Sequence, residues 1–330
     1  MKKKRITMRD LAKLANVSVA TISMALNGKE GIGEETRERV LNLAKEYNYL
    51  VNRNARSLKT NNNQLIGVIT PDIQNPFFSW IVSELNKYID KNGYTMLLGI
   101  SGQEIESSLV REMCSRGVEG IILIPSFNQS DRTYNHYFFN VPIVICTVNS
   151  NYQQIPSVCT DLKLGEYKLT SHLIQQGYQG FAFVGTNIEN WITKERYEGF
   201  LQALDENNLN ETDLFYEVEE PSFHSGYGIA EKVLASNPEV ITCINDVLAL
   251  GLLKYCTEIG LSIPNDIAIA GYDDIWVSSL VTPQLTTVKQ PVEKIAKKSV
   301  EILLNQFKNK DLQEYSVHIE PELLIRNTTK

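Results

Sequence analysis

The side chains of residues 7–28 have types and spacings that suit recognition of another molecule's surface. Thr7 and Asp10 have the three-residue spacing of a capping box, which begins a helix. Asn16 tolerates the left-handed backbone that ends that helix, and Ser18 can cap the next helix by accepting hydrogen bonds from its first free amides. Two short helices joined by a tight turn are the pattern of a helix-turn-helix, which reads DNA. The alternative is an ordinary helical hairpin with no role at nucleic acid.

Charge is distributed unevenly along the chain. Residues 1–60 hold thirteen Lys and Arg against six Asp and Glu, a balance of +7, whereas the whole chain carries −7. The remainder of the chain therefore carries −14. A basic segment attached to an acidic body is expected of a headpiece that binds phosphates. The asymmetry favours the DNA-reading interpretation over the plain hairpin.

The residues that could catalyse a reaction are not arranged to do so. The four histidines have no metal-ligand spacing, and the sequence contains no Gly-x-Ser-x-Gly elbow, Walker loop or Gly-x-Gly-x-x-Gly turn. Five cysteines without a Cys-x-x-Cys spacing are expected to be reduced and mostly buried. We therefore expect no enzyme, no metal and no cofactor.

Length and hydropathy predict a protein of several domains that does not span a membrane. At 330 residues and 43% hydrophobic, the chain can bury sizeable cores. Polar residues, rather than an apolar signal sequence, follow the basic N-terminus, and no apolar run is long enough to span a bilayer. We expect a cytoplasmic protein with no membrane partner.

A third helix is expected over residues 34–47, where it would close a three-helix headpiece around Leu11, Val17 and Ile22. A polar, basic linker follows over residues 50–63. The inward face of the third helix is expected to hold Val40, Leu41, Ala44 and Tyr47.

From Gln64 onwards, short apolar strands alternate with helices. Continuously apolar strands between helices predict parallel sheets covered on both faces, and the length fits two doubly wound halves. Ligands of such sheets bind at the carboxyl ends of the strands. Strands are expected near 65–70, 94–99, 120–125, 141–147, 181–185, 240–244 and 267–271, and helices near 78–91, 105–116, 164–176 and 194–207.

Seven motifs occur in a fixed order along the chain. They are residues 17–28, 52–58, 66–78, 117–123, 245–246, 271–274 and 285–291. Together they resemble the LacI/GalR family of transcription repressors, from Thr7 to about Thr328. The resemblance implies an α/β protein: a small all-α helix-turn-helix headpiece, followed by two doubly wound parallel-sheet subdomains shaped like a periplasmic sugar-binding protein.

The resemblance also implies domain boundaries and partners. Residues 1–49 would be the headpiece, 50–62 a hinge helix, and 63–330 an effector-binding and dimerisation core. The N-subdomain would comprise about 63–161 and 292–322, and the C-subdomain about 162–291 and 323–330. A homodimer would bind a near-palindromic operator in double-stranded DNA under the control of a small-molecule effector.

By this resemblance, the second helix lies in the major groove with Val19 and Ala20 at the base edges. Two small apolar side chains cannot make bidentate hydrogen bonds, so they would contact thymine methyls or permit close approach. Met24 stands where Arg is common in the family, which removes an expected guanine contact; alternatively, Met24 packs inside the headpiece. The other implied headpiece contacts are Thr7, Ser18, Thr21, Ser23 and Asn27.

The linker gains a role from the same resemblance. Residues 50–62 would fold into a helix only on DNA, with Leu58 wedged into the central minor-groove step. Alternatively, Leu58 is a linker residue with no such role. Val51 replaces the usual proline, so the entry to the hinge is less constrained. The implied contacts beside Leu58 are Asn52, Ala55, Arg56 and Lys59.

Arg196 and Asp273 match a charged pair that holds polar groups of the effector; alternatively they form a structural salt bridge. A planar guanidinium, a carboxylate and aromatic faces suit a neutral polyol such as a sugar. Thr147 stands where Asp is frequent, and Pro221 where a stacking aromatic is common. The other candidate effector contacts are Phe77, Phe78, Trp191, Phe223 and Asn245, and core packing is the alternative role of the two adjacent phenylalanines.

The implied mechanism is a population shift, in which effector bound between the two halves changes their orientation and the spacing of the hinges. An inducer would favour release from DNA, and a corepressor would favour binding. Alternatives are a regulator that responds to a nucleobase, a phosphorylated metabolite or a protein corepressor, and a solute-binding protein with the same core. The basic headpiece argues against the solute-binding protein.

Overall fold

Three helices with a shared apolar core form the headpiece. They are α1 (Met8–Ala15), α2 (Val19–Leu26) and α3 (Glu34–Glu46). The expected capping box is present, because the Thr7 hydroxyl accepts from the Asp10 amide and the Asp10 carboxylate accepts from the Thr7 amide. Asn16 ends α1 in the left-handed conformation, with φ 52°. The core contains Leu11, Ala12, Ala15, Ile22, Ala25, Val40 and Ala44.

The third helix buries a different face from the one expected. Leu41 and Tyr47 are each 44% exposed, whereas Val40 and Ala44 are buried. Leu43 packs against the core instead. Val40 is followed three and four positions later by Leu43 and Ala44, and these spacings place all three side chains on one helical face. Leu41 lies beside this face, and Tyr47 follows the last residue of α3. The assignment of Leu41 and Tyr47 to the inward face is therefore wrong.

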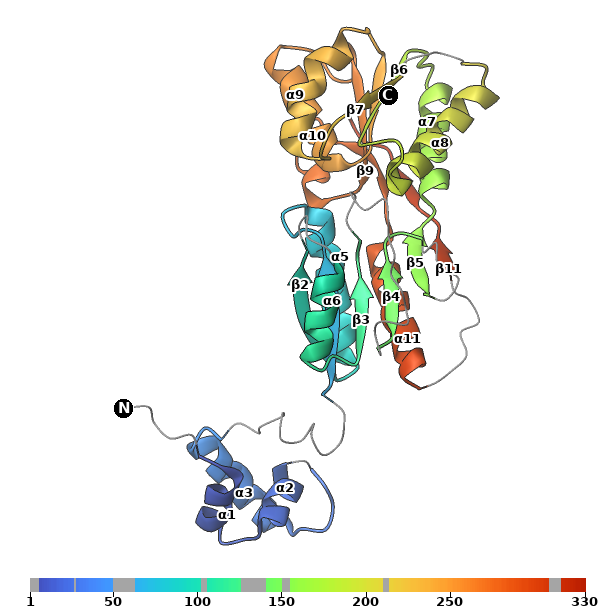
Figure 1. Ribbon diagram of the computed structural model, residues 1–330. Helices are drawn as coiled ribbons and strands as arrows, with labels where there is room; N and C mark the ends of the chain where they lie inside the picture. Colours follow the sequence, from blue (N-terminus) through green and yellow to red (C-terminus); the bar gives the residue numbers. More distant parts are fainter. Residues whose placement is uncertain are drawn as a thin grey trace. The chain divides into compact units, whose positions relative to one another are not determined.

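The computed structural model describes residues 6–26, 28–49, 63–101, 106–125, 141–149, 155–209, 214–308 and 316–330. The chain divides into two compact units, residues 1–63 and 64–330. In the second unit, the described residues form two six-stranded sheets, which we call sheet A and sheet B. Figure 1 labels most of these strands and the α-helices that flank them.

Sheet A has the strand order β11-β5-β4-β3-β1-β2, and its recorded pairs are all parallel. Its helices include α5 (Pro76–Lys91), α6 (Glu106–Ser115) and α11 (Val292–Phe307). The strands are β1 (Leu65–Thr70), β2 (Thr95–Ile100), β3 (Gly120–Leu123), β4 (Ile143–Cys146), β5 (Ser157–Thr160) and β11 (Ser316–Ile319).

Sheet B has the order β12-β10-β9-β8-β6-β7. Its strands are β6 (Phe181–Gly185), β7 (Phe215–Glu217), β8 (Val240–Cys243), β9 (Ala268–Asp273), β10 (Thr286–Lys289) and β12 (Glu322–Leu324). Its helices are α7 (Leu162–Gln175), α8 (Trp191–Glu206), α9 (Phe223–Leu234), α10 (Asp246–Glu258) and the short 3-10 helix η2 (Trp276–Ser279).

Among the described strand pairs, one is antiparallel: β12 runs antiparallel beside β10. Residues 320–321 carry the chain from sheet A to the carboxyl edge of sheet B, where Glu322 pairs with Lys289. A strand that enters at the carboxyl edge can only run backwards along its neighbour. A parallel entry would need a longer connection.

The described strands require three crossovers between the sheets: Asp161 after β5, residues 290–291 after β10, and residues 320–321 after β11. Each sheet therefore combines strands from distant parts of the chain. The five cysteines are free thiols, and four of them are buried. None of the described helices has the length and apolar character needed to cross a membrane.

Candidate DNA-reading headpiece and effector site

The N-terminal end of α2 presents small exposed side chains. Val19 is 43% exposed, and Ser18 and Ala20 are exposed beside it. The Ser18 hydroxyl accepts from the Thr21 amide at 3.0 Å and lies 2.8 Å from the Thr21 hydroxyl, so Ser18 caps the helix as predicted. A helix end of this shape can approach base edges closely and contact thymine methyls.

Two cations that we did not single out from the sequence lie beside this helix end. Arg9 and Lys13 of α1 are exposed, and both line a hollow with Asn16, Val17 and Ser18. The free amides at the start of α2 add partial positive charge there. The hollow therefore suits a phosphate of the DNA backbone. The four-residue spacing of the two cations on the polar face of α1 was the available signal.

Replacing Arg9 with Ala should weaken binding to all DNA sequences by a similar factor, because a phosphate contact carries no base information. The slope of log affinity against log salt should fall by about 1. Fluorescence anisotropy at several salt concentrations measures both effects. Lys91→Ala in the second unit is the control and should leave the slope unchanged. An unchanged slope for Arg9→Ala would contradict the assignment.

The other described residues among the predicted DNA contacts are exposed or half-buried. Met24 is half-buried, and its Cε lies 3.7 Å from the position of a Cβ built on Gly31, so it packs partly against the loop after α2. Thr7 is exposed, and Thr21 and Ser23 are half-buried. The remaining predicted contacts, Asn27, Asn52, Ala55, Arg56, Leu58 and Lys59, lie outside the described residues.

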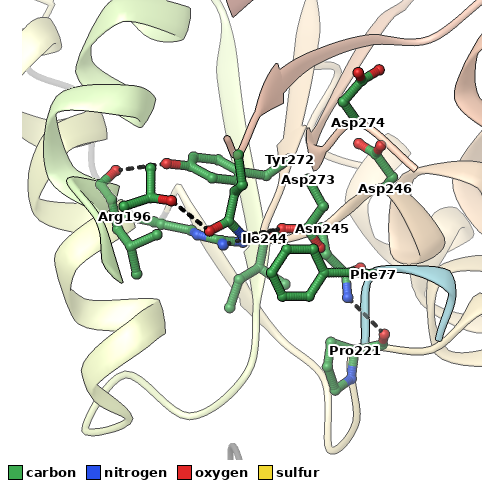
Figure 2. A network of polar contacts seen from close by, with 12 residues as sticks. Phe77, Arg196, Pro221, Ile244, Asn245, Asp246, Tyr272, Asp273 and Asp274 are labelled. Carbon is green, nitrogen blue, oxygen red and sulfur yellow. Dashed lines mark hydrogen bonds and ion pairs between the residues drawn. The ribbon is translucent and has the colours of Figure 1, made fainter. Parts of the chain in front are cut away.

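In sheet B, a buried ion pair joins α8 to the end of β9 (Figure 2). Arg196 Nη2 lies 3.3 Å from Asp273 Oδ1, with the two side chains 4% and 6% exposed. Arg196 Nη1 donates to the Ile244 carbonyl, and the guanidinium lies 3.6 Å from the centroid of the Tyr272 ring. A carbonyl, a carboxylate and an aromatic face thus hold the guanidinium in place. The pair that the sequence separates by 77 residues is in direct contact.

Asp273 combines burial, charge and backbone strain. Its φ is 117°, and its Oδ1 accepts from Gln290 Nε2 at 2.7 Å as well as from Arg196. Burial raises the pKa of Asp273 to about 6, although Arg196 and Gln290 favour the charged form. Asp274 and Thr147 also have positive φ, at 55° and 77°. Strained backbone concentrated at strand ends is typical of ligand sites.

Asn245 uses both of its polar side-chain atoms within the protein. Its Oδ1 caps α10 by accepting from the Leu248 amide at 2.9 Å, and its Nδ2 donates to the Pro221 carbonyl at 3.1 Å (Figure 2). The side chain is 1% exposed. Asn245 therefore positions the loop before α9, and a direct effector contact would use the remaining amide hydrogen of Nδ2 or the remaining lone pair of Oδ1.

The apolar candidates are mostly core residues. Phe77 and Phe78 are both 5% exposed, contact each other edge to face at 5.6 Å, and belong to an apolar cluster that includes Ile275 from beyond β9. Thr147 is buried, and Trp191 is half-buried against the core of sheet B. Phe223 is 38% exposed and lies edge-on to its neighbour His224.

Asp246 lies near this site and received no role from the sequence, although its motif was noted. Its Oδ1 accepts from the Thr287 hydroxyl at 2.5 Å, and its Oδ2 accepts from the Ser278 hydroxyl and the Ile275 amide at 2.6 and 2.9 Å. Burial and the nearby Asp273 charge raise the pKa of Asp246 to about 8. Asp246 thus fastens the segment after β9 to the start of α10. Its burial is a tertiary property that the sequence does not display.

Glu166 on α7 is a second carboxyl that we did not single out. It is fully buried, its Oε1 lies 3.5 Å from the Thr170 hydroxyl, and its Oε2 accepts no hydrogen bond within the described chain. Burial raises the pKa of Glu166 to about 8, against the opposing influence of the Arg196 charge. The folded protein therefore holds a proton on Glu166 that the unfolded chain releases at lower pH.

Core stability should fall as pH rises from about 4.5 to 8, because the unfolded chain ionises Glu166 across that range while the folded chain keeps the proton. Glu166→Gln should match the original protein near pH 4.5. By pH 8 it should be more stable by about 1–3 kcal/mol, because no proton has to be held in a buried site. Urea unfolding across this pH range measures the difference. The exposed Glu112→Gln is the control, and an equal gain there would contradict the prediction.

Comparison with known proteins identifies the family. Residues 7–52 match the model of bacterial regulatory proteins of the lacI family, and residues 170–329 match a periplasmic binding protein-like domain. The ribose operon repressor of Halalkalibacterium halodurans is 34% identical over 98% of this chain and 97% of its own. The chain belongs to the LacI family. The HTH-type transcriptional repressor PurR of Vibrio vulnificus is 31% identical over 98% of both chains.

A solved structure supports the same family assignment. The Lac repressor dimer bound to operator and the anti-inducer ONPF matches this chain with a TM-score of 0.87 and 27% identity, covering 99% of both chains. The expected fold class, a helix-turn-helix headpiece with a core of two parallel-dominated sheets, is confirmed. LacI-family membership places the chain among DNA-binding transcriptional repressors, and its relatives are repressors rather than enzymes.

Proposed function

We propose that this repressor binds a pseudo-palindromic operator as a homodimer and that a neutral, sugar-like molecule at Arg196 and Asp273 controls it. The buried Arg196–Asp273 pair is the observation that carries the choice of effector. Asp273 already balances the charge of Arg196, so the pair offers no surplus cation to a phosphate or carboxylate. Hydroxyl groups both donate and accept, and they can bind such a pair without adding charge.

Two relatives support parts of this proposal. A related protein is a ribose operon repressor, which favours a sugar as the effector class. The Lac repressor was solved as a dimer on its operator, which favours the same assembly here. DNase footprinting of the region upstream of the protein's own and neighbouring genes should show two protected half-sites. Purely non-specific binding at physiological salt would overturn the operator proposal.

The effector class can be tested by thermal shift on the full chain. We expect a neutral sugar such as ribose to raise the melting temperature, because binding to the folded state stabilises it by mass action. Hypoxanthine and fructose 6-phosphate represent the alternative nucleobase and phosphorylated classes. Asp273→Asn should reduce the shift, while Thr286→Val, a buried change elsewhere in sheet B, should preserve it. A shift with the phosphorylated sugar alone would overturn the proposal.

Leu58→Ala should weaken specific operator binding by at least tenfold while leaving the thermal shift with effector intact. The reason is that a minor-groove wedge stabilises the kinked DNA on which specific contacts depend. Comparing the affinity for a duplex that carries the operator with the affinity for a scrambled duplex of equal length separates specific from non-specific DNA binding. Simultaneous loss of effector binding would mean that Leu58 acts in the core instead.

A further inference from the structure

The second crossover carries an amide side chain that contacts both sheets. Gln290 lies between β10 and α11 and is 2% exposed. Its Oε1 accepts from the Thr160 hydroxyl at 2.8 Å, and its Nε2 donates to Asp273 Oδ1 at 2.7 Å. Thr160 ends β5 in sheet A, and Asp273 ends β9 in sheet B. A chain of hydrogen bonds through one side chain therefore joins the carboxyl ends of the two sheets.

The orientation of this amide is dictated by its partners. A carboxylate can only accept, so the amide nitrogen must face Asp273 and the amide oxygen must face Thr160. Thr160, Gln290 and Asp273 are 0%, 2% and 4% exposed. Breaking one of these bonds would leave a buried polar group without a partner, which is costly. The two sheets therefore cannot reorient without changing the contacts of Gln290.

Residues at the first and third crossovers also make contacts with neighbouring segments. The amide of Asp161, at the first crossover, donates to the Ile319 carbonyl at 3.1 Å. Lys168 Nζ, on α7, lies 2.5 Å from Glu320 Oε1 at the third crossover. A hydrogen bond thus connects the first crossover to the end of β11, and an ion pair connects the third crossover to α7. Gln290 adds to this set a direct bond to the charged residue of the effector site.

We propose that Gln290 is the positioning residue that transmits the state of Asp273 to the orientation of the two sheets; this rests on the proposed role of Asp273 as an effector contact. A donor from the effector shares the charge of Asp273 and weakens its charge-assisted bond with Gln290. With that bond weakened, the amide has only its bond to the Thr160 hydroxyl to give up when the sheets reorient. Effector occupancy in sheet B thereby loosens a contact made by the last residue of β5 in sheet A.

A double-mutant cycle in the full-length chain tests this relay. Thr160→Val removes the hydroxyl with little change in volume, and Asp273→Asn removes the charge with a residue that tolerates positive φ. Urea unfolding followed by tryptophan fluorescence reports on the second unit, which contains all three tryptophans, Trp80, Trp191 and Trp276. Thr160→Val should lower the midpoint clearly in the original chain and by less than half as much in the Asp273→Asn background.

If the relay passes through Gln290, the coupling between Thr160 and Asp273 must also disappear when Gln290 is replaced. In a Gln290→Leu background, or Gln290→Met if that variant does not fold, the two changes should be additive. Thr286→Val is the matched control, because the Thr286 hydroxyl bonds to the Thr329 hydroxyl and the Arg326 amide rather than to Gln290. Its effect should be equal in both Asp273 backgrounds. Equal effects of Thr160→Val in both backgrounds, or coupling that survives loss of Gln290, would overturn the proposal.

The double-mutant cycle is measured without DNA and without effector. Failure of the effector assignment would appear instead as an absent thermal shift with ribose. The two failures are therefore distinguishable. A merely structural role for Gln290 would lower stability in every background without coupling Thr160 to Asp273.

Discussion

Replacing Arg196 with Met should lower the free energy of unfolding of the core by roughly 3–5 kcal/mol near neutral pH. The change leaves Asp273 as a buried carboxylate without a cation and removes a donor from the Ile244 carbonyl. It also removes the guanidinium from the face of Tyr272. Urea unfolding followed by tryptophan fluorescence measures the loss, and the variant should also lose the thermal shift with effector.

An exposed ion pair provides the control for Arg196. Arg116 pairs with Glu112 on α6, where the side chains are 60% and 53% exposed. Arg116→Met should cost less than about 0.5 kcal/mol, because solvent screens such pairs. Equal losses for the two arginines would contradict the assignment of a buried, structurally essential charge.

The pH dependence of the Arg196→Met variant has a definite sign. The folded-state pKa of Asp273 already lies above its ordinary 3.8, at about 6, and loss of Arg196 raises it further. A raised folded-state pKa gives stability at low pH that is lost as pH rises from about 3.8 through the folded-state pKa. The deficit of the variant should therefore grow between pH 4 and 7. Adding Asp273→Asn to the Arg196→Met variant should recover part of the lost stability. No recovery would contradict the explanation that an unpaired Asp273 carboxylate causes the deficit.

Gly251→Ala and Gly226→Ala should each destabilise the core by roughly 1–3 kcal/mol or more, because the helices α9 and α10 cross at these glycines. A Cβ on Gly226 would overlap the Leu248 carbonyl oxygen, and a Cβ on Gly251 would overlap the Phe223 carbonyl oxygen. The obstacles are backbone atoms, so no side chain can move aside and the helices must separate. Separation would also strain the bond from Asn245 to the Pro221 loop.

Gly228→Ala is a matched control on the same helix. A Cβ at Gly228 meets nothing within 4 Å. This substitution should stabilise the protein by about 0.5–1 kcal/mol, because alanine is the better helix former. Thermal unfolding of the three variants gives the comparison. Destabilisation of similar size at Gly228 would show that helix propensity, rather than the crossing, is responsible.

Local features of the headpiece were predictable because their causes lie within a few residues. The capping box of Thr7 and Asp10, the left-handed Asn16 and the Ser18 cap each depend on bonds to neighbours in the chain. The inward face of α3 was less predictable. Leu41 is as apolar as a core residue, and only the packing of α3 against α1 and α2 decided that it faces solvent.

The residues of the effector site also fall into two groups, those that the sequence indicated and those that only the structure revealed. Arg196 and Asp273 were found through a resemblance between motifs, and the structure brings them into contact. Glu166 and Gln290 were missed, because a glutamate or a glutamine in the sequence is ordinarily a surface residue. Their burial results from helices and crossovers that assemble from distant segments.

The sequence by itself determined the class of this protein: a basic, capped helix-turn-helix on an acidic α/β core, with the motifs of a repressor family in order. Only the tertiary structure decided how the strands pair within each sheet and which charges the core buries. Strand alternation reports which segments are strands but not which sheet they join, so the antiparallel β12 and the three crossovers were invisible to it. Burial likewise depends on every segment that packs around a side chain, and this is why the Thr160–Gln290–Asp273 chain appears only in the folded molecule.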